Sequence, residues 1–166
     1  TRADGTPVLL PDQDRARWDR LQIARGLRAL ERARRLGGAD GAYALQAALA
    51  ACHARARRSE DTDWAAIAAL YARLMVVAPS PVVALNRAVA VSRAEGAAVA
   101  LPLVDALQDE TRLRGYAPLH AVRGDLLQQL QRRDEARAAF ERAAALTGNA
   151  RERALLLARA ASCDKD

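Results

Sequence analysis

The sequence predicts an all-α protein, a stack of about three helical hairpins with a flanking N-terminal helix and a C-terminal capping helix. Apolar residues recur at helical spacing along the chain, and no segment shows the alternation typical of a strand. Ala, Leu, Arg and Glu are abundant, and these residues lose little side-chain freedom in a helix. The 166 residues suffice for one domain with a buried core.

The first helix follows a turn-rich start. Residues 1–11 contain glycine and two prolines and are predicted to form an extended linker, so the helical domain would cover 12–166. Asp12 is the expected N-cap, because its carboxylate can accept the free amide protons of a first turn. The helix is expected to end at Leu36, before two consecutive glycines.

Seven further helices are predicted from the same signals. Ser59 or Thr62 is expected to cap the helix that starts near Asp63, and Pro102 is expected either to kink its helix or to lie in the first turn. The predicted ranges are about 42–57, 64–78, 82–94, 97–107, 118–131, 134–146 and 150–160.

The helices fall into pairs that repeat at a period of about 36 residues, close to the 34-residue tetratricopeptide unit. The second of two similar pairs carries the small–small–aromatic–small pattern Gly124, Ala136, Phe140 and Ala143. The equivalent positions of the preceding pair are Ala88, Ala100, Val104 and Leu107. Small residues let two helices cross closely while Phe fills the gap, so the pattern favours tetratricopeptide-like stacking over a generic helical bundle.

Composition limits the function classes. The 26 basic and 20 acidic residues leave a net charge of +6, which permits an anionic partner. The arginines are, however, spread along the chain and lie near acids in many places, which favours a solvated surface. Two cysteines without a CxxC motif fit a reducing cytoplasm. The sequence has no run of 18 apolar residues and no visible signal peptide, so neither a membrane nor an exported location is predicted.

No constellation typical of an enzyme is found. Cys52 and His53 are neighbours and would point about 100° apart on a helix, which disfavours a metal or nucleophile–base pair. Acids at helix starts are explained as caps, and no phosphate loop or zinc spacing occurs. We therefore expect no catalytic residue, no metal, no cofactor and no small-molecule substrate.

Two features are candidates for protein contacts. The first is the N-terminal polar cluster, defined as Asp12, Gln13, Asp14, Arg15, Trp18 and Asp19. It is either a capped helix with weak surface ion pairs or a docking motif, because Trp and Arg are favoured interface anchors. The second is Asn86 in a hydrophobic helix, which could bind the backbone of a peptide or satisfy a nearby loop carbonyl.

The segment "DGTPVLLPDQDRARWD" resembles the start of the C-terminal extension in a group of bacterial extracytoplasmic-function (ECF) RNA polymerase sigma factors. The resemblance continues through "YALQAALAACHARA", "DTDWAAIAALYARL", "APSPVVALNRAVAV" and "LTGNARERALLL". It implies a tetratricopeptide-like regulatory domain, here a C-terminal fragment of a longer cytoplasmic sigma factor. It also implies that the N-terminal polar cluster contacts the sigma regions of the same polypeptide or core RNA polymerase, with DNA reached only through the full-length protein.

Two other functions stay open at this stage. The chain could be a free-standing tetratricopeptide-type scaffold that binds peptides on its concave face, with Asn86, Arg87 and Arg123 as lining residues. Alternatively, its arginines could bind nucleic acid directly, with an affinity that falls steeply with salt. The scarcity of aromatic residues argues against stacking on a single strand.

Overall fold

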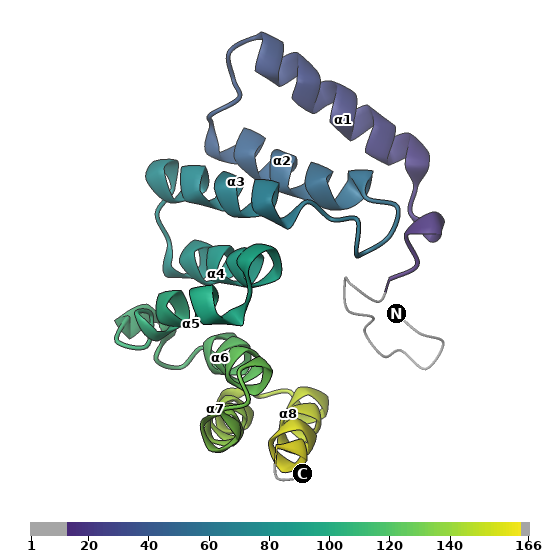
Figure 1. The fold of residues 1–166 in the computed structure, drawn as a ribbon. Coiled ribbons are helices and arrows are strands. Elements are labelled where there is room, and N and C mark those ends of the chain that lie inside the picture. Colours follow the sequence, from purple (N-terminus) through teal and green to yellow (C-terminus); the bar gives the residue numbers. More distant parts are fainter. Residues whose placement is uncertain (1–12, 164–166) are drawn as a thin grey trace. The chain divides into compact units, whose positions relative to one another are not determined.

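A computed structural model describes residues 13–163, and these residues form only helices and connecting turns (Figure 1). The chain divides into two compact units, unit 1 (Thr1–Ala78) and unit 2 (Pro79–Asp166). Within each unit, helices that follow one another in the sequence pack together. The predicted all-α class and the helical repeat stack are confirmed.

The described residues of unit 1 form one short 3-10 helix and three α-helices. They are η2 (Arg15–Arg17), α1 (Arg20–Arg35), α2 (Ala42–Arg55) and α3 (Trp64–Val77). Helix α1 packs on α2, and α2 packs on α3. Leu30 of α1 is buried against Ala48 and Ala51 of α2, and the half-buried Leu27 and Leu70 close the cluster. The alanines let the helices approach closely, while the leucines supply the buried apolar area.

The start of unit 1 departs from the prediction of one continuous helix to Leu36. The expected cap Asp12 and the expected linker 1–11 lie outside the described residues. Residues 15–17 form a separate 3-10 turn, Trp18 has extended backbone angles (φ −72°, ψ 143°), and α1 begins only at Arg20. Asp14 and Trp18 therefore do not lie one turn apart on a continuous helix.

The cap of α3 also differs from the prediction. Asp63, rather than Ser59 or Thr62, is the N-cap, and its carboxylate accepts a hydrogen bond from the Ala66 amide at 2.9 Å. Thr62 is buried, and its hydroxyl accepts a hydrogen bond from the distant Arg15. That tertiary contact is the reason why Thr62 does not serve as the local cap.

The part of unit 2 that the structure describes, up to residue 163, forms five α-helices and one 3-10 turn. They are α4 (Pro81–Glu95), α5 (Ala97–Asp105), η3 (Thr111–Leu113), α6 (Ala117–Gln129), α7 (Arg133–Leu146) and α8 (Ala150–Ser162). Pro102 lies inside α5, beyond its first turn, and the helix ends three residues later. Leu107 therefore lies past the end of α5, so the predicted equivalence of Leu107 with Ala143 inside α7 is wrong.

The other predicted repeat positions form the core of unit 2. Ala88, Ala100, Val104, Ala136, Phe140 and Ala143 are all 0% exposed. A Cβ atom on Gly124 would lie 2.6 Å from Phe140 Cε1, so the absence of a side chain lets the Phe140 ring lie directly on the α6 backbone. The close crossing of α6 and α7 expected from the sequence pattern is confirmed.

Helix α8 covers the α6–α7 hairpin, as predicted for a capping helix. The Asn149 side chain caps its start by accepting from the Arg151 and Glu152 amides. Arg159 of α8 lies over the Phe140 ring at 4.3 Å from the centroid and forms an ion pair with Asp125 of α6. None of the helices among the described residues combines the length and apolar character needed to cross a membrane.

Candidate protein-interaction site

Two aspartates of the N-terminal polar cluster are helix caps. Asp14 Oδ1 accepts a hydrogen bond from the Ala16 amide at 3.0 Å and starts the 3-10 turn. Asp19 Oδ1 accepts from the amides of Leu21 and Gln22, each at 3.0 Å, and starts α1. Each carboxylate thus satisfies amide protons that have no partner within their own helix, and both side chains remain at the surface.

Arg15 points into unit 1 and is only 3% exposed. Its Nη1 donates to the backbone carbonyls of His53, Ala56 and Arg58 at 3.1, 3.2 and 3.1 Å. Its Nη2 donates to Thr62 Oγ1 at 3.1 Å. One guanidinium therefore binds the last turn of α2 and both sides of the α2–α3 loop, an arrangement that we call the Arg15 clamp.

The Arg15 clamp holds a positive charge against neutral acceptors. The bonded carbonyls lie at the C-terminus of α2, where the helix dipole carries partial negative charge that favours a cation. The guanidinium carbon also lies 5.4 Å from the centre of the Trp18 ring, within range of a cation–π contact. These contacts replace the carboxylate partner that a buried arginine would ordinarily require.

The same contacts affect His53, the last-turn residue of α2 whose carbonyl Arg15 binds. The imidazole packs edge-on against Trp64, with ring centroids 5.5 Å apart. Burial lowers the pKa of His53 below its ordinary value, and the positive charge of Arg15 lowers it further. His53 is therefore held neutral beside the clamp.

The residues predicted to act together as a docking motif have different environments in the structure. The guanidinium of Arg15 is committed to the interior of unit 1 and cannot also anchor a partner. Asp14 and Asp19 are exposed, and Gln13 and Trp18 are half-buried. What the cluster offers to a partner is therefore the accessible part of Trp18, flanked by two capping carboxylates.

The candidate residues of unit 2 do not form one site. Asn86 on α4 is exposed, as a peptide-binding residue would be. Arg87 is half-buried, and its Nε is buried without a hydrogen-bond partner among the described residues. Because they are adjacent on one helix, their side chains leave the helix in different directions.

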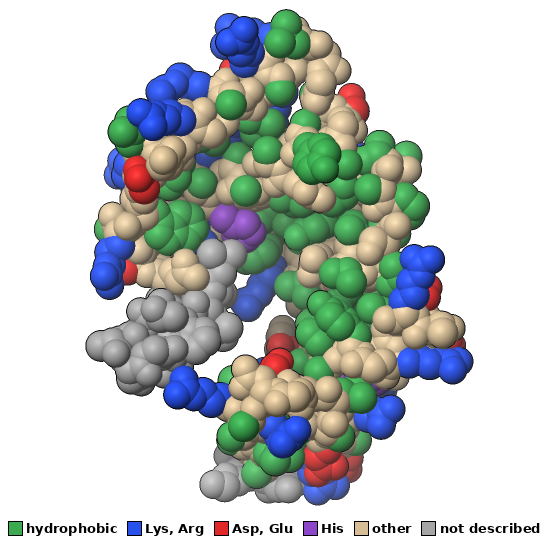
Figure 2. Space-filling view, turned by 180° about the vertical axis from the view of Figure 1, so that it is seen from behind, with side chains coloured by type: hydrophobic (Ala, Val, Ile, Leu, Met, Phe, Trp, Pro, Cys, Tyr) green, Lys and Arg blue, Asp and Glu red, His purple; other side chains and the backbone are tan. Residues whose placement is uncertain are grey.

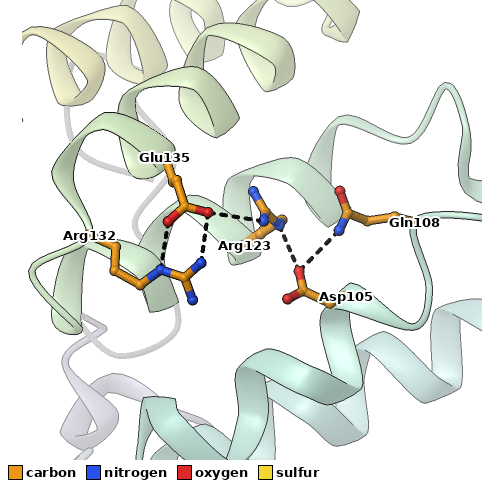
Figure 3. Close-up of polar contacts among 5 residues, drawn as sticks. All are labelled: Asp105, Gln108, Arg123, Arg132 and Glu135. Carbon is orange, nitrogen blue, oxygen red and sulfur yellow. Dashed lines mark hydrogen bonds and ion pairs between the residues drawn. The ribbon is translucent and has the colours of Figure 1, made fainter.

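Arg123, the third expected lining residue, is part of an internal ion-pair network (Figure 3). Its Nε lies 2.7 Å from Asp105 Oδ1 and its Nη2 lies 3.8 Å from Glu135 Oε2. Arg132 binds Glu135 through two hydrogen bonds of 2.7 Å, and these bonds lower the pKa of Glu135. Gln108 donates to Asp105 at 3.0 Å. The network ties the end of α5 to α6 and to the start of α7, so Arg123 has a structural role.

The metal-ligating and nucleophilic side chains of the described residues do not gather at one place. Residues 13–163 contain no group of three His, Cys, Asp or Glu side chains able to hold a metal. Cys52 is half-buried, and burial raises the pKa of its thiol, which disfavours the reactive thiolate. An open depression beside it is lined by Arg55, Arg57, Asp61 and Asp63, whose opposite charges balance one another.

Sequence reasoning missed one surface, the row of arginines along α1. The helix contains six arginines and one glutamate, so its positive charge is not balanced locally. The i, i+3 and i+4 spacing of Arg25, Arg28, Arg32 and Arg35 was readable in the sequence. A charge count over the whole chain hides this row, because such a count averages over all the helices.

Comparison with known proteins finds a relative of this chain. The chain is 51% identical over 154 residues to an uncharacterized protein of Rhizobium meliloti (strain 1021). The match covers 93% of this chain and 36% of that protein, so the chain spans about a third of the length of the curated relative. No family model matches the chain. No solved structure matches it.

Proposed function

We propose that the chain is the regulatory, protein-interaction domain of an ECF sigma factor. In this proposal it supports transcription initiation by contacting the sigma regions of its own polypeptide or core RNA polymerase. It has no enzymatic role, needs no cofactor and works in the cytoplasm. Recognition of promoter sequence belongs to the rest of the full-length protein.

The Arg15 clamp is the observation that carries the proposal. It ties the segment by which the chain enters unit 1 to the α2–α3 loop, through acceptors 38 to 47 residues away in the sequence. A regulatory extension needs such a rigid connection, because contacts made by the extension are then transmitted to the sigma regions that precede it in the polypeptide. The relative, more than twice as long as this chain, further supports a segment that acts within a larger protein.

Within this proposal the cluster residues have different roles. Arg15 fixes the segment before α1 to the α2–α3 loop. Asp14 caps η2 and Asp19 caps α1, and Trp18, which lies between these two helices, supplies the accessible contact surface. Trp is well suited to this role because a large rigid side chain buries much area at low entropic cost. The engagement of Arg123 in an internal network argues against the alternative of a peptide-binding scaffold lined by this residue.

The test is promoter activity in the full-length protein that carries this chain. Deletion of residues 12–166 should abolish reporter transcription, and Trp18→Ala or Asp14→Ala should reduce it strongly. Tyr43→Ala is the matched control, because Tyr43 is an aromatic residue of the same unit that is 90% exposed and outside the cluster. Each variant of the 166-residue chain is also unfolded in urea to measure its stability.

The two measurements together distinguish the outcomes. Lost transcription with an unchanged free energy of unfolding identifies Trp18 and Asp14 as a docking surface. Lost transcription with lowered stability assigns them a structural role and moves the contact surface to the hairpins. Full transcription by the protein that lacks residues 12–166 would contradict the proposal.

A further inference from the structure

The positive charge of the chain is concentrated in one helix. The whole chain has a net charge of +6, and the 16 residues of α1 carry six arginines against one glutamate, an excess of five. Figure 2 shows Lys and Arg side chains gathered along the edge that α1 forms, at the upper left of that view. The next largest excess among the described helices is two, in η2 and in α8.

Four of these arginines form a continuous row, which we call the α1 stripe. Arg25, Arg28, Arg32 and Arg35 follow one another at spacings of three and four residues, and all four are exposed. They lie on the face opposite Leu27 and Leu30, which pack toward α2. At a rise of 1.5 Å per residue the row is about 15 Å long.

The α1 stripe is poorly neutralised. Its one ion pair among the described residues joins Arg35 to Glu31 at 3.6 Å, and both side chains are more than half exposed. An exposed pair of this kind contributes little. Such a row of like charges repels itself at low salt, and a polyanion that lies along it would relieve that repulsion.

We propose that the α1 stripe binds the phosphate backbone of duplex DNA without reading its sequence. Protein interfaces usually have an apolar or aromatic centre and a charged rim. The α1 stripe has the opposite order, because its centre is arginine and its exposed apolar residues, Leu21 and Leu36, lie at its two ends. Arginine is a preferred phosphate donor, and the small, exposed Ala29 beside the row leaves room for a backbone to approach.

This inference goes beyond the proposed function and does not depend on it. It departs from the expectation that DNA is contacted only through the full-length protein, since it assigns a backbone contact to this chain itself. Promoter recognition is not involved, so binding to DNA of arbitrary sequence tests the α1 stripe alone. Absence of DNA binding by the α1 stripe would leave the sigma-factor proposal intact. Failure of the sigma-factor proposal would likewise leave the inference about the α1 stripe intact.

The experiment is fluorescence anisotropy of a labelled 30-base-pair duplex of arbitrary sequence, titrated with the 166-residue chain at several salt concentrations. Four phosphate contacts predict that log K falls against log salt with a slope of about −3.6. The triple variant Arg25→Gln, Arg28→Gln, Arg32→Gln should bring this slope to about −0.9 and weaken binding at 50 mM salt at least about tenfold.

A control variant separates the α1 stripe from net charge. Arg114→Gln, Arg142→Gln, Arg151→Gln removes the same charge from exposed positions scattered over unit 2, and it should keep the wild-type slope. Equal loss of binding by the two triple variants, or no binding by the wild-type chain, would overturn the inference. So would tighter binding to a polyglutamate peptide than to the duplex, which would point to an acidic protein instead. Circular dichroism of both variants verifies that helix content is retained.

Discussion

Arg15 donates a hydrogen bond from Nη2 to Thr62 Oγ1 at 3.1 Å, although the two residues are 47 positions apart in the sequence. Both are buried, at 3% and 5% exposure. This bond and the three bonds from Nη1 to backbone carbonyls join η2, which precedes α1, to the end of α2 and to the loop that precedes α3. Arg15 of the N-terminal polar cluster is thereby part of the tertiary structure of unit 1.

Loss of the Arg15 clamp should destabilise unit 1. Arg15→Gln leaves buried carbonyls without a donor, and we expect the free energy of unfolding to fall by about 2–4 kcal/mol. Arg15→Lys should recover only part of it, because an ammonium lacks the planar fork that reaches all four acceptors. Tryptophan fluorescence during urea unfolding measures this loss selectively, because both tryptophans, Trp18 and Trp64, belong to unit 1.

Arg17→Gln is the matched control for this prediction. Arg17 lies in the same 3-10 turn but is exposed, so its replacement should change the free energy of unfolding by less than about 0.5 kcal/mol. Equal effects of the Arg15 and Arg17 substitutions would mean that the clamp contributes no more than surface charge does.

The helices were predictable where local signals decide them. The caps and proline–glycine signals gave most of the helix ends to within two or three residues, and the small–small–aromatic–small pattern located the α6–α7 crossing. The pattern predicts this crossing correctly because Gly124 and Phe140 contact each other directly, and both residues can be identified in the sequence.

The break before α1 was not predictable from local sequence. Residues 13–36 are rich in Arg, Ala and Leu, which favour a helix, although Asp14 and Asp19 within them are also good N-cap residues. The observed 3-10 turn and the extended Trp18 are favoured because they bring Arg15 to acceptors at the end of α2, which only the tertiary fold assembles. The same distant contacts bury Arg15, and local sequence therefore predicts the cluster as a surface motif although its arginine is buried.

Gly124→Ala should destabilise unit 2, opposite to the usual effect of this substitution in a helix. The added Cβ would lie 2.6 Å from Phe140 Cε1, and the ring, which is 0% exposed, has no space to move. We expect a loss of about 1–3 kcal/mol, measured as reduced hydrogen-exchange protection of the α6 amides. Gly26→Ala in α1, where nothing lies within 4 Å, should instead stabilise its helix by about 0.5–1 kcal/mol.

A double variant tests whether the Phe140 ring is the cause. If the clash explains the loss, Phe140→Leu should cost less in the Gly124→Ala background than in the wild-type chain. Additive effects of the two substitutions would show that the steric account of the α6–α7 crossing is incorrect.

The ion-pair network of unit 2 should depend mainly on Arg123. Its side chain is 18% exposed and links Asp105 of α5 with Glu135 of α7, so Arg123→Gln should cost about 1–2 kcal/mol of local stability. Arg132 also binds Glu135 but is 46% exposed, so Arg132→Gln should cost less stability than Arg123→Gln. Hydrogen exchange of α5 and α7 reports both. A larger effect at Arg132 than at Arg123 would contradict this assignment.

Unit 1 should lose stability in mild acid because of His53. Its pKa is lowered in the folded chain by burial and by Arg15, so the unfolded chain binds the proton more readily. The stability linked to His53 is therefore complete above its ordinary pKa of about 6.5 and is lost as the pH falls through the lower, folded value. Urea unfolding followed by tryptophan fluorescence at pH 8 and pH 5 measures this loss, since the other histidine, His120, lies in unit 2. His53→Gln should flatten the pH dependence over this interval, and an unchanged slope in that variant would assign the titration to another group.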